Sequence, residues 1–529
     1  MAATDQLGTQ GNPLTQSAQA TLVGSTQAGD KVTLLNTHQA TVANTAGAFQ
    51  FGNVALQEGV NNLAVQITDA AGNTSQFALS VTRIAASATG NAAIQWNQVI
   101  LNAIETDAST PEYASRALAI ESIAVMNAVN ALNGTPGYLY NLTAPADANA
   151  NAAVAQAAHD VLAWLYPAQA STFDAVLAST LSAIPNGQAK TDGISLGSAS
   201  AAKIIALRAN DGYNTNIVDT GGTGVGIWQP TGPGFAPAQD PQWANLQTFA
   251  LNSPNQFTST LPGPPSLTSQ AYADALNQTE SLGAGNSTTR TADQTQIAKF
   301  WSDGQGTYTP PGAWNAIADQ AAESQGYSLA ATAQLLGELN IAMADSAIAA
   351  WNVKYTDNTW RPITAIQNAH SIGNSAITQN SSWQPLLITP NFPEYVSGHS
   401  TFSAAAAEVL TSFFGANYAF STTSSSLPGV TRSYTSFWDA ANEAGMSRIY
   451  GGIHFSFSNT DGLTLGTEVG EYVLKVFSQT QDTTPPKIEI NQPSGFATNA
   501  NPTITGTVTD NLSGVAALGY TLDETEHSF

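Results

Sequence analysis

The sequence contains no cysteine among its 529 residues. The chain therefore has no disulfide, no thiol nucleophile and no cysteine-ligated zinc or iron–sulfur centre. Basic residues are also scarce, because 14 Lys and Arg stand against 37 Asp and Glu, which gives a formal net charge of -23. A surface of this sign repels nucleic acids and anionic membranes, so we expect neither as a partner.

Long apolar runs are missing as well, and no leader sequence is predicted in the first residues. No run of apolar residues is long enough to cross a bilayer, so no transmembrane segment is predicted. Residues 1–20 lack the basic start and the apolar core of a secretory signal peptide, so either export uses another signal or the sequence is a fragment of a longer protein. We expect the fragment, because of the pattern at the other end of the chain. Hydrophobic residues make up 43% of a chain that is too long for one core, which predicts a multidomain globular protein.

Both ends of the chain are patterned as β-structure. In residues 13–84, alternating apolar residues flank a turn at 69–73, which predicts a small all-β sandwich. Residues 484–529 follow a Pro-rich linker and show similar alternation, but they are too few for a complete sandwich. Both segments resemble bacterial immunoglobulin-like repeats. The resemblance implies a secreted or bacterial cell-surface protein whose parent chain carries further immunoglobulin-like modules.

Residues 92–478 contain Ala-rich runs with helical periodicity. One run begins at Pro111 and ends at Asn133, and another covers residues 331–354. Residues 213–270 are instead rich in Gly, Pro, Asn and Thr, as in long ordered loops. The predicted fold class is multidomain: a central all-α helical-bundle domain, or two fused bundles, with small all-β immunoglobulin-like sandwich modules at the N-terminus and, in part, at the C-terminus.

Three cations of this acidic chain stand at notable places. Lys354 lies near the end of a predicted helix, and Arg361 precedes Pro362, which is suited to the first turn of the next helix. Two solvated surface cations are the alternative interpretation of this pair. Arg448 and His454 lie on either side of a Gly-Gly pair, where the chain can bend so that both side chains face one point.

A Ser-Gly-His sequence precedes another Ala-rich run. Ser397 and Gly398 would expose backbone N–H groups at the positive end of a helix, which is a ready binding place for an anion. An ordinary helix N-cap is the alternative interpretation. His399 taken alone would more often be structural than catalytic. The three cations shift that balance toward a functional site.

Together the pieces form a three-part signature. It consists of Lys354, six residues and Arg361-Pro362, then Ser397-Gly398-His399, then Arg448, five residues and His454. This signature resembles that of the vanadium-dependent haloperoxidases, the type 2 phosphatidic acid phosphatases and the bacterial acid phosphatases. Segments 113–119, 228–231 and 300–304 are also similar to bacterial haloperoxidases, so the resemblance covers residues 92–478. One departure is Val396, where these families commonly have Pro, and it removes no ligand.

The resemblance implies vanadate as the cofactor, with phosphate able to take its place. His454 would bind the vanadium, and His399 would act as the acid–base next to it. Lys354 would also assist catalysis by polarising bound peroxide. Fixed donors around a multiply charged oxyanion are the electrostatic arrangement that such chemistry needs. The oxygens of the anion would be held by Lys354, Arg361, Ser397, Gly398 and Arg448.

Three further residues match positions in the fungal enzymes. Asp303 would pair with the site arginines, whereas its alternative role is that of an exposed turn carboxylate. Trp351 and Phe392 would line a halide pocket, whereas their alternative role is to fill the core.

The implied activity is the oxidation of a halide by hydrogen peroxide to hypohalous acid or halogenated small organic substrates. The alternative is a phosphatase in which His454 forms a phosphohistidine and His399 protonates the leaving alcohol. Trp351 and Phe392 favour the haloperoxidase. A third interpretation, a surface adhesion module with an inactive helical domain, is disfavoured because the set of site residues is complete.

All candidate site residues lie between the two β-patterned flanks. We predict that residues 90–480 alone fold and retain full vanadate-dependent activity. Melting curves and peroxidase assays of the truncated and the full chain would measure this. A well-folded truncation without activity would contradict it.

Overall fold

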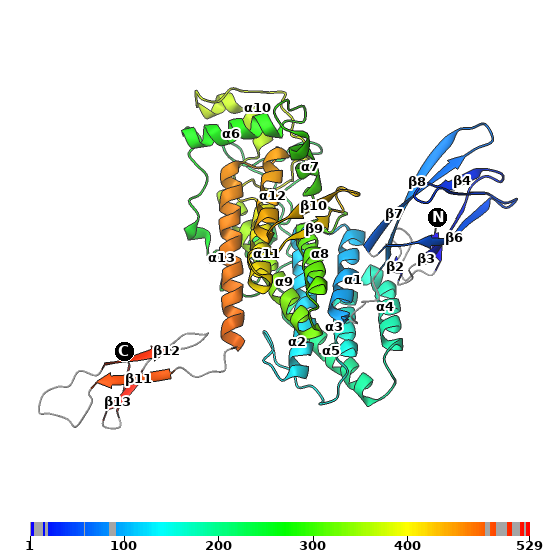
Figure 1. The fold of residues 1–529 in the computed structure, drawn as a ribbon. Helices are drawn as coiled ribbons and strands as arrows, with labels where there is room; N and C mark the ends of the chain where they lie inside the picture. The colour runs from blue at the N-terminus through cyan, green and yellow to red at the C-terminus, as the bar shows by residue number, and fades with distance from the viewer. Residues whose placement is uncertain are drawn as a thin grey trace, which may run out of the picture.

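The computed structural model describes residues 2–4, 14–15, 19–57, 59–83, 91–481, 487–492, 505–509, 519–522 and 525–528. Within these ranges the chain forms an N-terminal β-module, a large helical body and C-terminal strands (Figure 1). The predicted multidomain architecture, a helical domain with an immunoglobulin-like module before it, is confirmed.

The N-terminal module consists of two sheets, with strand orders β1-β3-β6 and β2-β8-β7-β4-β5. Apolar residues from both sheets pack between them, among them Leu22, Phe51 and Val65. Strand β1 lies before residue 13, where the sequence places the start of the module. The strands are β1 (Ala2–Thr4), β2 (Leu14–Thr15), β3 (Gln19–Ser25), β4 (Lys31–Leu34), β5 (Gln39–Val42), β6 (Ala48–Ala55), β7 (Gly59–Thr68) and β8 (Thr74–Arg83).

The turn predicted at residues 69–73 joins β7 to β8. Asp69 Oδ1 accepts hydrogen bonds from the backbone N–H groups of Ala71 and Asn73, at 2.9 and 2.8 Å. Such a carboxylate accepts hydrogen bonds from the N–H groups of the turn in place of backbone carbonyl groups. The turn sets the register in which Leu63 lies opposite Leu79, and both are buried. The alternation seen in the sequence therefore becomes the inner face of the module.

The helical body contains thirteen α-helices and a small β-hairpin within residues 91–481. They are α1 (Ala92–Asp107), α2 (Pro111–Asn133), α3 (Ala150–Leu165), α4 (Ala170–Ser182), α5 (Gln188–Arg208), α6 (Gln270–Gly283), α7 (Ala292–Phe300), α8 (Thr309–Ser324), α9 (Leu329–Asp357), α10 (Pro362–Gln367), α11 (Gly398–Phe414), the strands β9 (Phe420–Thr423) and β10 (Thr431–Tyr434), α12 (Phe437–Tyr450) and α13 (Ser456–Gln481). Short 3-10 helices lie at Pro167–Gln169, Pro241–Asn245, Thr258–Thr260 and Ala369–Ile372.

Local signals place the ends of these helices. Helix α2 begins with Pro111 after the N-cap Thr110 and ends before Gly134, whose φ of 68° suits a left-handed C-cap. Helix α9 begins after Ser328, whose hydroxyl accepts from the Ala331 N–H at 3.2 Å. It ends at Asp357, and the following C-cap residue, Asn358, is left-handed with φ of 50°. The predicted helix at 331–354 is thus confirmed and is one turn longer than expected.

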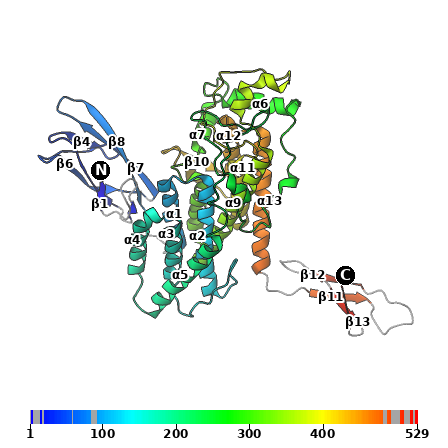
Figure 2. The ribbon, with the colours of Figure 1, turned by 180° about the vertical axis from the view of Figure 1, so that it is seen from behind.

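Helix α9 is the central element of the body. Almost every side chain from Thr332 to Lys354 is buried. The helix contacts α2 on one side and α11 and α13 on the other, as two opposite views show (Figures 1 and 2). A helix that is apolar on all sides must be surrounded by others. The end of α9 that carries Lys354 is therefore inside the protein.

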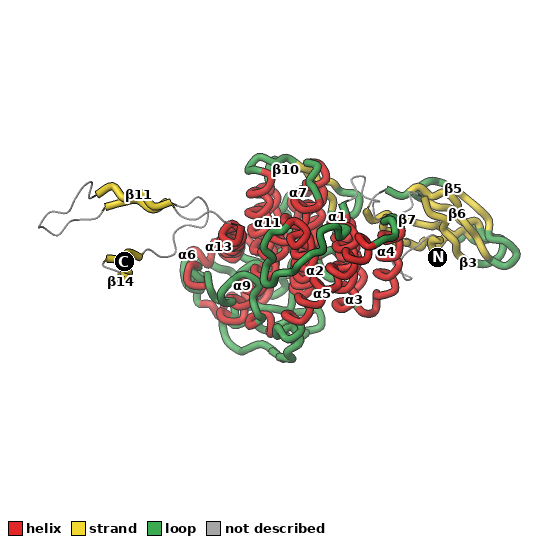
Figure 3. Tube along the Cα trace, turned by 90° about the horizontal axis from the view of Figure 1, so that it is seen from below, coloured by secondary structure: helices red, strands yellow, loops and turns green. Residues whose placement is uncertain are grey.

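The sequence left open whether this region is one domain or two fused bundles. Two buried clusters are present, and helices α2 and α3 contribute residues to both. On α3, Ala153 and Val161 belong to the larger cluster, whereas Val154 and Leu162 belong to the smaller one. The two bundles are consequently joined through shared helices, and the long loops lie at the surface of the packed helices (Figure 3).

Four C-terminal strands form two antiparallel pairs. They are β11 (Lys487–Gln492), β12 (Thr505–Thr509), β13 (Gly519–Leu522) and β14 (Thr525–Ser528). The predicted strand around residue 488 is confirmed, while the predicted Ile504 lies outside the described residues. No helix among the described residues is both long and apolar enough to span a membrane.

Two carboxyl groups are buried between helices of the body. Glu121 on α2 is 2% exposed, and burial raises its pKa to about 8. Asp319 on α8 is 5% exposed, and burial raises its pKa well above the usual value, with the nearby carboxylate of Glu323 adding to the shift. Both groups are therefore held in the protonated form, because an unpaired carboxylate in an apolar interior is costly.

Glu121→Gln should make the protein more stable at alkaline pH than the wild type. The folded-state pKa of Glu121 lies above its unfolded value of 4.5, so the folded state binds the extra proton and loses stability as the pH rises toward 8. The loss is up to about 1.4 kcal/mol per pH unit. Denaturant unfolding at pH 5 to 9 would measure a gap between variant and wild type that widens with pH. The exposed Glu471→Gln on α13 should show no widening, and a constant gap for Glu121→Gln would refute the assignment.

Candidate functional site

The end of α9 and the start of α10 position the first pair of cations. Lys354 lies in the last turn of α9, and Arg361 is the N-cap residue of α10, which begins at Pro362 as predicted. Between them, Thr359 and Trp360 pair with the loop around Gly226 through backbone hydrogen bonds. Both cations are 0% exposed. The alternative of two solvated surface cations is therefore excluded.

Ser397 and Gly398 begin α11 as the sequence suggests. Ser397 is the N-cap residue, and its hydroxyl accepts from the Ser400 N–H at 3.4 Å. Gly398 lies against Trp351 so closely that an added Cβ would be 3.4 Å from the indole ring. The first N–H groups of a helix have no partner within it. The Gly398 N–H at the start of α11 is therefore without a partner inside its own helix.

A tight turn brings Arg448 and His454 to the same place. Arg448 lies in the last turn of α12, and His454 comes just before α13. Gly452 has φ of 77°, and an added Cβ there would lie 2.4 Å from the Gly283 carbonyl oxygen. The turn thus requires glycine both for its conformation and for the space. The predicted bend at the Gly-Gly pair is present.

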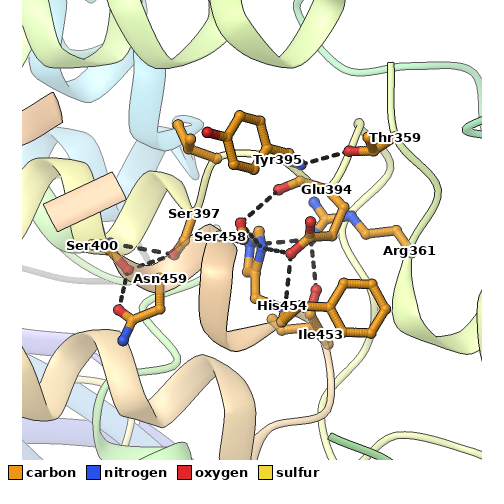
Figure 4. Close-up of polar contacts among 12 residues, drawn as sticks. Thr359, Arg361, Glu394, Tyr395, Ser397, Ser400, Ile453, His454, Ser458 and Asn459 are labelled. Atoms are coloured by element: carbon orange, nitrogen blue, oxygen red, sulfur yellow. Dashed lines mark hydrogen bonds and ion pairs between the residues drawn. The ribbon is translucent and has the colours of Figure 1, made fainter. Parts of the chain in front are cut away.

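The ring of His454 has a single consistent tautomer (Figure 4). Arg361 Nη1 lies 3.1 Å from His454 Nε2, and a guanidinium can only donate, so Nε2 must accept. The proton therefore resides on Nδ1, which lies 2.9 Å from Glu394 Oε1. Glu394 Oε1 also accepts from the Phe455 N–H at 2.9 Å. The lone pair of Nε2 faces the cations.

Lys354 is bound to the segment before α11. Its Nζ donates to the carbonyl oxygens of Pro393 and Glu394, each at 3.1 Å, and also to that of Val396. Burial and Arg361 lower the pKa of Lys354, whereas three carbonyl acceptors favour the ammonium, which alone has three protons to donate. Lys354 holds the 393–396 segment in place. A direct contact with an anion would require one of these protons to turn.

Arg361 and Arg448 each keep an unused donor. Arg361 Nε donates to the Phe392 carbonyl at 2.7 Å and Nη1 to the Ile453 carbonyl at 2.9 Å, and Arg448 Nη1 donates to the Trp301 carbonyl. Arg361 Nη2 and Arg448 Nε, however, are buried without a partner within the described part of the chain. Buried donors are nearly always satisfied, so these two indicate a ligand.

His399 adds a third unused nitrogen. The residue as a whole is partly exposed, but Nε2 of its ring is buried and has no partner among the described residues. Burial and Arg448 hold the pKa of His399 well below its usual value. Burial, with Arg361 next, does the same for the pKa of His454. Both rings are therefore neutral at neutral pH. We call the seven residues the anion site: Lys354, Arg361, Ser397, Gly398, His399, Arg448 and His454.

The anion site has an excess of buried positive charge. Among the described residues, the carboxyl groups that act on the three cations are Glu394, Asp303 and Glu112. Burial raises the pKa of Glu394 to about 7 and that of Glu112 to about 8, which limits the negative charge they supply. Burial raises the pKa of Asp303 to about 6, partly offset by Ser426 and Arg448. Asp303 is 3% exposed, so it is not an exposed turn carboxylate. It accepts from the Ser426 hydroxyl at 3.0 Å and makes no ion pair with Arg448 within the described residues.

The two predicted aromatic residues lie beside the cations. The rings of Trp351 and Phe392 are 5.0 Å apart, and the Phe392 ring lies 5.0 Å from Lys354 Nζ and 4.6 Å from Arg361 Cζ. Trp351 is 1% exposed, while Phe392 is partly exposed. The two rings therefore lie at the anion site and do not serve the core alone. Side chains that line a pocket for a small ion must lie in such a position.

Sequence reasoning missed Glu394. Glu394 is not among the predicted site residues, yet it is the partner of His454 Nδ1 and is 0% exposed. A carboxylate five residues before a candidate catalytic histidine was the available signal. The pairing with His454, 60 positions later, could not be read from the sequence.

Comparison with known proteins gives a consistent result. Residues 334–483 match the family described as the VCPO second helical-bundle domain, and residues 1–82 match a bacterial Ig-like domain. The vanadium chloroperoxidase of Curvularia inaequalis is 27% identical over 29% of this chain, and the match spans 29% of the chloroperoxidase's length.

Two solved structures resemble most of the chain. A bacterial vanadium-dependent iodoperoxidase superimposes with a TM-score of 0.63 and 30% identity, over 73% of this chain and 95% of the iodoperoxidase. A bacterial vanadium-dependent chloroperoxidase superimposes with a TM-score of 0.56 over 70% of this chain and 93% of its own. Its identity is 18%, so this likeness concerns the fold alone.

Glu394→Ala should weaken the binding of vanadate to the anion site by about 10- to 100-fold, because His454 loses the acceptor that fixes its tautomer. Glu394→Gln keeps a carbonyl oxygen for Nδ1 and should weaken binding less. Isothermal titration calorimetry with orthovanadate would measure both. Glu338→Ala, which removes a buried glutamate elsewhere on α9, is the control. Equal affinities for wild type and Glu394→Ala would show that Glu394 does not position the ring.

Proposed function

Because this chain belongs to the vanadium-dependent haloperoxidase family, as 30% identity over 95% of a bacterial iodoperoxidase shows, we propose that it oxidises a halide with hydrogen peroxide at the anion site. The single observation that carries the proposal is a pair of buried guanidinium donors, Arg361 Nη2 and Arg448 Nε, that have no partner among the described residues. They belong to the same site as His454, whose Nε2 is an acceptor.

The residues present fit vanadate. The two guanidinium donors match a multiply charged oxyanion, and the hydroxyl of Ser397 and the N–H of Gly398 add neutral donors at the positive end of α11. Gly398 leaves room that a Cβ would fill against Trp351. His454 Nε2 would hold the metal. When bound, vanadate supplies a Lewis-acidic centre that activates hydrogen peroxide toward a halide, and the vanadium keeps its oxidation state.

His454 is held ready as a ligand by its surroundings. The Nδ1 proton is directed to Glu394 and the ring is neutral, so Nε2 offers its lone pair. Arg361 Nη1 now occupies that lone pair at 3.1 Å and must release it when the ligand binds. Its neighbour Nη2 is already free to take an oxygen of the anion.

His399 is the group that moves protons. Hydrogen peroxide has to lose a proton on entering the site, and the neutral imidazole of His399 can accept it at Nε2. Arg448 beside the ring disfavours a second positive charge there, so His399 would readily give the proton to an oxygen of the bound anion. In this assignment His399 is a catalytic residue and not an anchor.

The aromatic pair forms the side at which a halide would arrive. Phe392 lies over Arg361 and Lys354, so a weakly hydrated anion against the ring would still be close to two positive charges. Trp351 Nε1 is buried without a partner in the described part of the chain and could donate to such an anion. We propose that this corner of the anion site receives the halide.

The phosphatase alternative uses the same residues, and phosphate could occupy the anion site. The comparisons find chloroperoxidases and an iodoperoxidase, and they give the phosphatase no separate support. We therefore treat phosphate as a competitor of vanadate, and phosphate-ester hydrolysis as the outcome that would displace our proposal.

The test combines purified protein, orthovanadate and hydrogen peroxide with iodide, bromide or chloride and a phenolic halogen acceptor. We expect halogenation only when vanadate, peroxide and a halide are all present, and inhibition by excess phosphate. An aryl phosphate ester is offered in parallel. Ester hydrolysis without any halogenation would favour the phosphatase.

Two histidine variants should separate binding from turnover in this assay. His454→Ala should abolish both vanadate binding and halogenation, because the ligand is lost. His399→Ala should still bind vanadate but turn over about 10² to 10⁴ times more slowly, because proton transfer is lost. The surface His370→Ala serves as the control. Unchanged vanadate affinity in His454→Ala would show that the ligand is misassigned.

A further inference from the structure

A short chain of hydrogen bonds runs from the anion site into the protein (Figure 4). Ser400 Oγ lies 2.8 Å from Ser397 Oγ and 2.7 Å from Asn459 Oδ1. Ser397 and Ser400 are 0% exposed and Asn459 is 7% exposed. Of these three residues, Ser397 alone was given a role by the resemblance to known families. Ser400 and Asn459 were not singled out by the sequence.

The protein makes room for this contact at the meeting point of three helices. Ser400 lies on α11 and Asn459 on α13, and Gly445 on α12 faces both. A Cβ at Gly445 would lie 2.1 Å from Asn459 Oδ1 and 3.3 Å from Ser400 Oγ. The other end of the amide, Nδ2, faces the sulfur of Met446 at 4.0 Å. Oδ1 is thus the end that meets Ser400.

Ser397 Oγ and Asn459 Oδ1 compete for the single hydroxyl proton of Ser400. Ser400 has one hydroxyl proton, yet it is the donor toward both Ser397 Oγ and Asn459 Oδ1. The amide oxygen can only accept. Ser397 Oγ also accepts from the Ser400 N–H at 3.4 Å. When both contacts from Ser400 are made, the acceptor capacity of Ser397 is filled, and its own proton is left to point toward the anion.

We propose that Ser400 is a positioning residue that directs the hydroxyl proton of Ser397 to the bound oxyanion, and that Asn459 competes for the Ser400 proton. When Ser397 donates to an anion, its oxygen becomes a better acceptor, because linked hydrogen bonds strengthen one another. The Ser400 hydroxyl then turns, so that it donates its hydrogen bond to Ser397 Oγ in place of Asn459 Oδ1. This inference rests on the proposed function, since it concerns the oxyanion that the site binds.

Substitutions of Ser400 and of Asn459 should change the affinity for orthovanadate in opposite directions. Ser400→Ala removes the donor that supports Ser397, so orthovanadate should bind about two- to ten-fold more weakly. Asn459→Ala removes the competing acceptor, so orthovanadate should bind more tightly, by about two-fold or more. A residue that merely supports the fold would weaken binding in both variants. In a Ser397→Ala background, neither substitution should change the affinity further.

Affinities would be measured by isothermal titration calorimetry with orthovanadate, and with phosphate as a second probe, on the full chain. Melting curves without anion confirm folding, and Ser115→Ala, a buried serine on α2 whose hydroxyl donates to the Glu112 carbonyl, controls for loss of a helical hydroxyl. Shifts of the same direction in Ser400→Ala and Asn459→Ala, or shifts that persist without Ser397, would overturn the proposal. A wild type that binds neither anion would instead refute the proposed function.

Discussion

The structure depends on the burial of three cations around one neutral histidine. Lys354, Arg361 and Arg448 are almost fully withdrawn from water, and removing charges from water is expensive unless they are paired or hydrogen-bonded. Carbonyl groups from three separate segments meet that requirement. Lys354 binds the segment before α11, Arg361 binds the carbonyls of Phe392 and Ile453, and Arg448 binds that of Trp301. The cations therefore hold the loops that form their own site, and the donors left over define its ligand.

The surrounding helices make this arrangement possible. Helix α9 is buried along its length and delivers Lys354 to the interior, while α11 and α12 supply a helix start and a helix end at the same place. The chain as a whole is strongly acidic, with a net charge of -23. At physiological salt, screening limits the reach of exposed charges to about 8 Å, so a buried positive site remains attractive to anions within an acidic protein. Local charge, and not net charge, governs what the site binds.

Around the anion site, hydrogen-bond direction matters as much as charge. Glu394 accepts a hydrogen bond from the Nδ1–H of His454 and so leaves Nε2 as the acceptor, which is the state a metal ligand needs. Ser400 performs a comparable task for Ser397 from the other side. In both cases a residue that does not contact the ligand determines which atom of the neighbouring side chain contacts it. The site is therefore larger than its seven-residue signature.

The sequence by itself determined the helical character of residues 92–478, the turn of the N-terminal module and the order of the signature residues. These depend on local rules, such as Pro111 at a helix start, Gly134 after a helix end and Asp69 in a turn. Only the tertiary structure decided that the cations are buried, that Lys354 binds carbonyls and that Glu394 meets His454. Such pairings join positions 39 to 60 residues apart, and they arise from how helices pack. No periodicity or spacing along the chain encodes which distant donor will face which acceptor, because that choice is made by packing alone.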